Sequence, residues 1–222
     1  MINQKIKTIT LPLPHKLGSV NCYLIKTDKG FILVDTGGSN ARLELEKEIQ
    51  MAGCVPGNLH LIVLTHGDFD HIGNANYLRE KYGARIIMHK DDVGMAERGN
   101  MFCNRKRVNI LFKVIAPVVF GFKKSNRFLP DQIIVEGFEL SEYGIQAKVL
   151  SIPGHSKGSI GILTTEGDLF CGDLLDNTET PTLNIIMDDP VFANTSLEKL
   201  ENLGIKKVYP GHGKPFSMEN LR

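Results

Sequence analysis

The chain has 222 residues, and 26 lysines and arginines against 25 aspartates and glutamates give it a formal net charge of +1. Hydrophobic residues make up 42% and charged residues 23%, which excludes a disordered chain or a coiled coil. The near-zero net charge offers no general attraction to nucleic acid or to an anionic membrane. The sequence contains no run of about 18 apolar residues, so it predicts no transmembrane helix. We therefore expect one domain that buries roughly 70% of its unfolded surface.

The cysteines and the first residues bear on the compartment. The segment MINQKIKTIT lacks the apolar stretch of a secretory signal. The cysteines are scattered, with no CxxC pair, at Cys22, Cys54, Cys103 and Cys171. We expect four reduced thiols and a cytoplasmic protein.

The predicted elements alternate between strands and helices. Apolar runs rich in β-branched residues predict strands at 22–26, 31–35, 61–65, 85–89, 148–152, 160–164 and 169–171. Tight turns at 28–30 and 166–167 predict hairpins. Helical faces predict helices at about 45–52, at 74–82, and from Thr195, where Glu198 has capping-box spacing, to Gly204. Early hairpins followed by strand–helix–strand units predict a mixed sheet covered by helices.

Residues 94–130 differ in composition from the rest of the chain. They hold eight of the 26 basic residues and one of the 25 acids, so this segment carries +7 and the remainder −6. They also hold five of the eleven phenylalanines. Two interpretations stay open: a helical excursion with a solvated basic face, or a lid that meets an anionic or amphipathic ligand. We call residues 94–130 the basic segment.

Candidate metal ligands crowd one short loop. The sequence HGDFDH, which follows a predicted strand directly, contains His66, Asp68, Asp70 and His71. The like charges of side chains this close together would repel one another, and the groups would stay poorly solvated, unless a cation lay among them. The loop therefore predicts a metal site.

Three further loops place one ligand type beside a glycine at a strand end. They contribute His155 after Gly154, Asp173 after Gly172, and His212 after Gly211. Glycine lets the backbone turn tightly and lets a metal or substrate approach. The three remaining histidines have no such setting and are expected to be structural or exposed: His15, His60 and His89.

Five motifs in order resemble the metallo-β-lactamase fold superfamily: LVDTG at 33–37, THGDFDH at 65–71, PGH at 153–155, GD at 172–173 and PGH at 210–212. The resemblance covers about residues 20–213. It implies an α/β fold, an αββα sandwich of two mixed β-sheets flanked by helices, with a binuclear metal site at one edge. By the same resemblance, the first metal would be held by His66, Asp68 and His155, and the second by Asp70, His71 and His212. Asp173 would bridge them, and Asp35 would support the ligands from behind.

The implied chemistry is hydrolysis. Two divalent ions, with zinc expected and iron or manganese as alternatives, share a bridging hydroxide that attacks an ester, thioester, lactone or related bond. Asp70 would orient this hydroxide as well as bind metal. Ser156 and Ser159 are expected to be loop caps, not nucleophiles.

The sequence departs from the family pattern at Asp68, because the usual loop reads His-x-His-x-Asp-His. One interpretation is drift that weakens or empties the first metal position. The other, which we favour, is a carboxylate ligand that shifts the preference towards harder ions. A carboxylate here also resembles the flavodiiron proteins, which carry Glu at this position and bind iron.

Three functions follow from the sequence. The leading one is a metal-dependent hydrolase of a small molecule, either anionic or amphipathic, with no nucleic-acid partner expected. The alternatives are a di-iron oxidoreductase and a metal-bound sensor with little turnover. The chain ends ten residues after His212, so we expect it to lack the glutathione-binding segment of the glyoxalase II branch. The sequence leaves the substrate, the native metal and the oligomeric state open.

Overall fold

The computed structural model describes residues 5–105 and 110–221. Its first sheet has six strands in chain order: β1 (Lys5–Pro12), β2 (Ser19–Lys26), β3 (Phe31–Val34), β4 (Leu59–Val63), β5 (Arg85–His89) and β6 (Gln132–Ile134). Strands β1 to β3 pair antiparallel, and β3 to β6 pair parallel, so the sheet is mixed.

The second sheet has five strands and is also mixed. Their order is β13 (Phe216–Ser217), β12 (Lys207–Pro210), β9 (Asp168–Gly172), β8 (Ile160–Thr164) and β7 (Ala147–Ser151). Only β12 and β9 pair parallel. A two-stranded ribbon, β10 (Leu175–Asp176) with β11 (Thr182–Leu183), stands apart from it.

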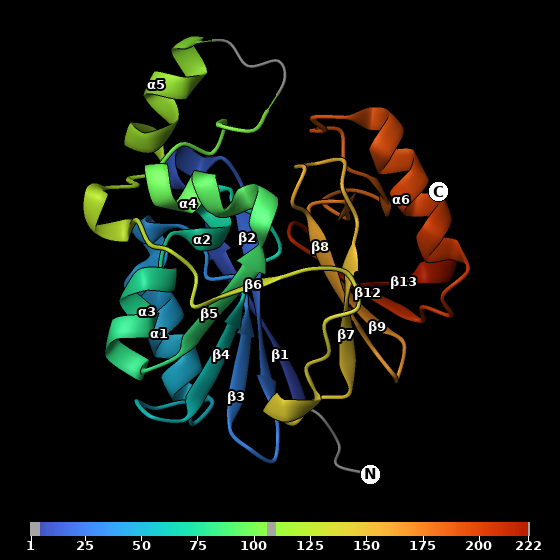
Figure 1. Cartoon of the computed structure of the whole chain (residues 1–222), viewed down its shortest axis with the longest axis horizontal. Coiled ribbons are helices and arrows are strands. Elements are labelled where there is room, and N and C mark those ends of the chain that lie inside the picture. Colours follow the sequence, from blue (N-terminus) through green and yellow to red (C-terminus); the bar gives the residue numbers. More distant parts are fainter. Residues whose placement is uncertain (1–4, 106–109, 222) are drawn as a thin grey trace.

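Helices cover the outer faces of both sheets, as Figure 1 shows. The first sheet carries α1 (Arg42–Met51), α2 (Phe69–Ile72), α3 (Ala75–Tyr82) and α4 (Val93–Arg98), and the second carries α6 (Pro190–Glu201). Helix α5 (Ile110–Val119) projects beyond α4 at the top of Figure 1. The expected αββα sandwich is confirmed.

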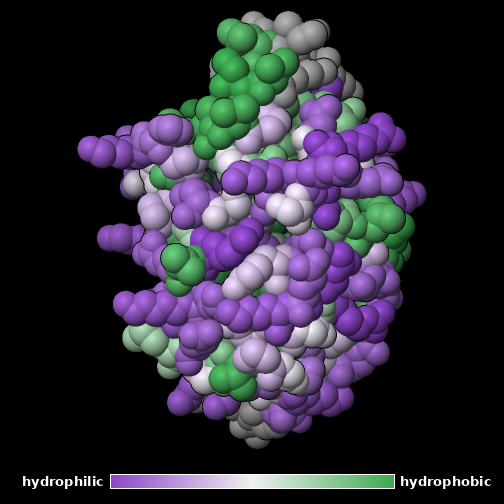
Figure 2. Space-filling view, turned by 90° about the vertical axis from the view of Figure 1, so that its left-hand side faces the viewer, coloured by the Kyte–Doolittle hydropathy of each residue, from purple (hydrophilic) through white to green (hydrophobic). Residues whose placement is uncertain are grey.

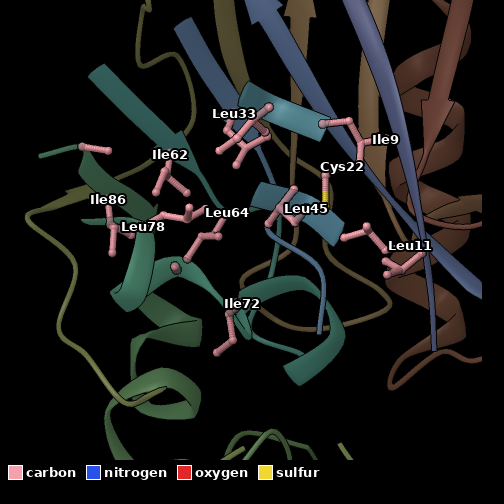
Figure 3. Packing of buried hydrophobic residues seen from close by; sticks show 14 of the residues in the cluster. Ile9, Leu11, Cys22, Leu33, Leu45, Ile62, Leu64, Ile72, Leu78 and Ile86 are labelled. Atoms are coloured by element: carbon pink, nitrogen blue, oxygen red, sulfur yellow. The ribbon is translucent and has the colours of Figure 1, made fainter. Parts of the chain in front are cut away.

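Alternation along the strands builds two cores on the first sheet. Ile32 and Val34 of β3 pack between the two sheets, whereas Phe31 and Leu33 pack beneath the helices. Successive side chains of a strand point to opposite faces. Because both faces are buried, these strands read as continuous apolar runs in the sequence. Figure 3 shows the helix-facing core, in which Leu33 lies near Leu45 of α1.

The predicted strands and helices are confirmed to within a few residues, except at the start of the last helix. Several short or edge elements were not predicted: β1, β6, β10, β11, β12, β13 and the short helix α2. The last helix begins at Pro190 and not at Thr195, so the predicted start is wrong. Asp189 caps it by accepting from the backbone N–H groups of Val191 and Phe192, and Thr195 lies inside the helix with its hydroxyl donating to Val191 O. A capping-box spacing can occur within a helix, and a nearby Asp-Pro pair is an equally good start signal.

The topology directs four strand ends to one edge of the sandwich. Strands β9 and β12 run parallel, and β7 shares their direction because both β7 and β9 pair antiparallel with β8. The loops after β7, β9 and β12 therefore meet at one edge, beside the loop that follows β4 (Figure 1).

The described parts of the basic segment, residues 94–105 and 110–130, lie at this end of the molecule and include α4 and α5. Four apolar side chains of α5 are exposed at helical spacing: Leu111, Val114, Ile115 and Val118. They form part of the hydrophobic ridge at the top of Figure 2. Among the described residues, no helix combines the length and the apolar character needed to cross a membrane.

Candidate metal centre

The seven predicted ligand residues come together at the shared edge. His66 follows β4, and Asp68, Asp70 and His71 lie at the start of α2 or within it. The other three follow the strands of the second sheet: His155 after β7, Asp173 after β9 and His212 after β12. All seven are buried except His212, which is partly buried.

Hydrogen bonds orient the four histidines in the same way. The Nδ1 atom of His155 lies 2.7 Å from Ile186 O, and that of His212 lies 2.6 Å from Ser19 O. A carbonyl oxygen only accepts, so each Nδ1 carries a proton, and in the neutral ring each Nε2 then has the lone pair that can bind a metal. His71 donates from Nδ1 to Asp35 Oδ2 at 2.9 Å, with the same result. Neutral imidazoles held by such a bond are the usual ligands of zinc.

His66 is oriented through Thr65. The Thr65 hydroxyl donates to Asp35 Oδ2 at 2.7 Å, so it accepts from His66 Nδ1 at 2.9 Å. Asp35 Oδ1 also accepts from Thr65 N at 2.8 Å. One carboxylate thus fixes two of the histidines. Asp35 has a φ of 58°, a left-handed conformation that is uncommon outside glycine and that turns its carboxylate towards them.

The ligand atoms form two groups joined by Asp173. The first group is His66, His155 and Asp173, and the second is Asp70, His71 and His212; within each, the atoms lie within 4.8 Å of one another. Asp173 Oδ2 lies 3.8 Å from His155 Nε2 and 3.2 Å from His212 Nε2, so it touches both groups. Two ligands of one tetrahedral zinc ion, each about 2.1 Å from it, lie about 3.4 Å apart. The observed separations fit this geometry.

The buried polar atoms fit a pair of metal ions. His66 Nε2, His71 Nε2 and Asp173 Oδ1 are buried with no hydrogen-bond partner among the described residues. A Cβ on Gly211 would lie 2.0 Å from Asp173 Oδ1, so only glycine leaves room at this point. Buried polar groups without partners are rare, and each calls for an explanation such as an ion. The donor set suits divalent cations, which would neutralise the three buried carboxylates.

Burial and mutual contacts perturb the metal-free side chains. Burial alone would lower the pKa of His212, but Asp173 and Asp70 raise it to about 9. Burial raises the pKa of Asp70, and its histidine neighbours offset only part of this effect. Strong perturbations of this kind are typical of functional sites.

Asp68 has a partner that the motif did not predict. Nη2 of Arg105, from the basic segment, lies 2.6 Å from Asp68 Oδ1 and 2.7 Å from Oδ2. It also lies 3.2 Å from His155 Nε2, which in turn is 3.1 Å from Asp68 Oδ2. Burial would raise the pKa of Asp68, but Arg105 and His155 hold it well below its ordinary value. The sequence identified Arg105 only as one member of a basic cluster; its neighbours Lys106 and Arg107 lie outside the described residues.

Asp92 is a second residue that the sequence analysis missed. It is fully buried, and its Oδ2 accepts from Gly67 N at 3.0 Å and from Ser156 Oγ at 2.6 Å, while Oδ1 accepts from Gly158 N at 2.9 Å. Asp92 therefore ties the loop of His66 to the loop of His155. Its position shortly after a predicted strand was the one available signal.

The other residues singled out in the sequence have simple settings. Ser156 N donates to Ser159 Oγ at 3.0 Å, which matches the expected loop cap. His15 and His60 are exposed, and His89 is buried with Nδ1 accepting from Asp91 N. All four cysteines are free thiols.

The chain belongs to the metallo-β-lactamase superfamily, whose sequence model matches residues 15–212. Among curated relatives, a hydroxyacylglutathione hydrolase, GloC of Haemophilus influenzae, is 31% identical over 70% of this chain and 66% of its own length. An acyl-coenzyme A thioesterase, MBLAC2 of Gallus gallus, is 29% identical over 72% of this chain and 59% of its own. The chain thus spans less than two thirds of either relative.

Solved structures agree with this assignment. The crystal structure of TTHA1623 in a di-iron-bound form is 27% identical, covers 94% of both chains and gives a TM-score of 0.70. An archaeal member of the superfamily, ST1585 from Sulfolobus tokodaii, gives a TM-score of 0.73 at 24% identity, over 96% of this chain and 82% of its own, and supports the fold. The family is one of metallo-hydrolases, as the names of several relatives state.

Proposed function

We propose that this chain is a binuclear metal-dependent hydrolase that cleaves an ester, thioester, lactone or related bond of a small molecule. The observation that carries the proposal is the convergence of four Nε2 lone pairs, each set by a hydrogen bond at Nδ1, with three buried carboxylates at one sheet edge. Two of these Nε2 atoms, those of His66 and His71, and Asp173 Oδ1 have no hydrogen-bond partner among the described residues, whereas a site built only for stability would pair its buried polar atoms.

The assignment of ligands follows the two groups. His66 and His155 would hold one ion, together with Asp68, which belongs to neither group but has its Oδ2 3.1 Å from His155 Nε2. Asp70, His71 and His212 would hold the other, and Asp173 would contact both. When bound, two divalent ions acidify water and stabilise the negative charge that develops on the substrate oxygen. Zinc suits the four imidazoles, and iron or manganese suits the carboxylates.

Asp70 is the proposed catalytic residue. Its Oδ2 lies 3.5 Å from His212 Nε2 and 3.9 Å from His71 Nε2, at the face shared with Asp173. Burial raises the pKa of this carboxyl, which makes it a better proton acceptor than an exposed aspartate. Asp70 would orient the attacking water and accept its proton at Oδ2.

Among the possible bonds, the surroundings favour an acyl thioester. Both relatives described above act on acyl–sulfur compounds by their names. Ile186, whose carbonyl holds His155, is 63% exposed beside Ile185 at 93%, so an apolar rim adjoins the site. This rim and the exposed face of α5 could contact an acyl chain, while the basic segment could contact an anionic leaving group. We therefore propose that residues 94–130 act as the substrate-recognition insertion.

A hydrolysis panel tests the proposal. Protein loaded with zinc or manganese should release thiol from short- and medium-chain acyl thioesters, detected with a thiol-specific chromophore. Asp70→Asn and exhaustive chelation should each remove the activity. Asp28→Asn, the same change at an exposed turn between β2 and β3, serves as the matched control and should keep it. Turnover that persists after verified metal loss would overturn the proposal.

One observation favours iron as the bound metal. The neighbour TTHA1623 was solved with two irons, and Asp68 offers an oxygen ligand that suits iron. A di-iron oxidoreductase would be coloured and hold redox-active iron, whereas a hydrolase would work with colourless zinc.

A cytoplasmic location stays a prediction, with which four free thiols agree.

A further inference from the structure

Arg105 reaches into the candidate metal centre from outside the motif loops. Its side chain is only 8% exposed, and Nη2 alone contacts both oxygens of Asp68 and His155 Nε2. Phe102 flanks the guanidinium at 5.9 Å from its ring centre. A buried cation thus already lies between two of the candidate ligands of the first metal position.

This place is also the one that a metal ion would need. An ion bound by Asp68 and His155 would lie about 2 Å from an oxygen of Asp68 and from His155 Nε2. His155 Nε2 has a single lone pair, which either the ion or Nη2 of Arg105 can take, at present Nη2 at 3.2 Å. Nη2 also lies 2.7 Å from Asp68 Oδ2, the oxygen that faces His155, so an ion there would displace this contact as well. The second position has no such competitor in the described part of the chain, where no lysine or arginine forms an ion pair with Asp70, His71 or His212.

We propose that Arg105 is a positioning residue that competes with metal for Asp68 and His155, so that the two metal positions load unequally. The inference rests on the binuclear site of the proposed function. The position of Asp70, His71 and His212 binds its ion first and tightly. The position of His66, Asp68 and His155 binds its ion weakly, because the ion must replace the contacts of Arg105.

Removing Arg105 should change the metal affinity in opposite directions, depending on whether Arg105 competes with the metal or supports its ligand. If Arg105 merely held Asp68 in place as a ligand, its removal would weaken metal binding. If Arg105 competes, its removal leaves Asp68 as a buried, unpaired charge that a metal ion then satisfies. The direction of the change in affinity therefore separates the two roles.

The test is a metal titration of metal-free protein with Mn²⁺ and, separately, Zn²⁺, read as bound metal per chain by equilibrium dialysis and elemental analysis. For wild type we expect two steps whose dissociation constants differ by about 100-fold. In Arg105→Gln the second step should tighten by about tenfold or more while the first changes by less than about threefold. Arg105→Lys, which keeps the charge, should resemble wild type, as should Arg98→Gln, an exposed arginine of the same segment.

Several results would overturn the inference. Two equal steps in wild type would do so, as would a second step that is unchanged or weaker in Arg105→Gln. A wild type that binds no metal would overturn the proposed function as well, so the two failures are distinguishable. Should Arg105→Gln not fold, wild type with one equivalent of Mn²⁺ gives the answer by anomalous diffraction. The ion should lie at Asp70, His71 and His212, and an ion at His66 and His155 would refute the competition.

Discussion

Asp92 allows a sharp test of how the two motif loops are held together. The substitution Asp92→Asn keeps the shape of the side chain and replaces one carboxylate oxygen with an NH₂ group. The least harmful orientation points this group at Gly158 N, because Oδ2 serves both Gly67 N and Ser156 Oγ. One buried hydrogen bond is then lost, and the other two no longer have a charged acceptor.

The expected cost can be worked from these contacts. A hydrogen bond to a charged group contributes about 1.5–3 kcal/mol, and a buried donor left without a partner costs about 1–3 kcal/mol. Burial raises the pKa of Asp92, so removing its charge offsets part of the loss. We expect the free energy of unfolding to fall by about 2–4 kcal/mol. With an m-value of about 2.5 kcal/mol/M, the urea midpoint should fall by roughly 1 M.

The assay is urea unfolding of chelator-treated protein, so that metal binding does not contribute to the midpoint. The control is Asp91→Asn, the same change one residue earlier. Asp91 is partly exposed, and Lys157 Nζ lies 3.6 Å from its Oδ1. Such a pair is worth about 0–1 kcal/mol, so the midpoint should move by less than about 0.4 M. Equal midpoints for Asp92→Asn and wild type would show that the charge of Asp92 does not hold the two loops together.

Three further predictions concern the ligands. Asp35→Asn should weaken metal binding by about 10–100-fold, because His71 loses the carboxylate that fixes its tautomer; unchanged affinity in a dialysis titration would contradict this. Because the pKa of His212 is raised to about 9 in the metal-free protein, its proton competes with metal above neutrality, and metal affinity should keep rising from pH 7 to 9. The same shift means that protonated His212 stabilises the metal-free fold fully below about pH 6.5, and that this stability is lost as the pH rises through about 9. An affinity that is flat above pH 7 would show that His212 is already neutral there. Asp68→His alone should not improve zinc binding, because it leaves Arg105 buried and unpaired. The double variant Asp68→His with Arg105→Gln should improve it. Tighter zinc binding by the single variant would contradict the pairing of Asp68 with Arg105.

The charge of Asp68 shows where sequence reasoning stops. From the motif alone, Asp68 adds a third negative charge to those of Asp70 and Asp173, which predicts a less positive centre than one with the usual histidine. In the structure, Arg105 supplies the compensating positive charge. The pair of Asp68 and Arg105 is as neutral overall as a histidine. The partner lies 37 residues away, within a segment whose composition marked it only as basic.

The rest of the site was visible in the sequence for a physical reason. Ligands at strand ends lie beside glycines, as at Gly211, and this local pattern can be recognised in the sequence without knowledge of the fold. Strands β3 and β4 could also be predicted, since both are largely apolar runs. The connection made by Asp92 joins loops that are distant in sequence, so it depends on tertiary structure and leaves no local pattern. Helix α6 was misplaced at its start because Asp189 and Thr195 both resemble caps.

The most direct test of the binuclear site is anomalous diffraction from crystals grown with excess Mn²⁺ or Zn²⁺. We expect two anomalous peaks at the edge where β4, β7, β9 and β12 end. One should lie within bonding distance of His66, His155 and Asp173, and the other of Asp70, His71 and His212, with Asp173 shared. With both positions full, Arg105 should have left His155. Peaks elsewhere, or a single peak at saturating metal, would contradict a binuclear centre.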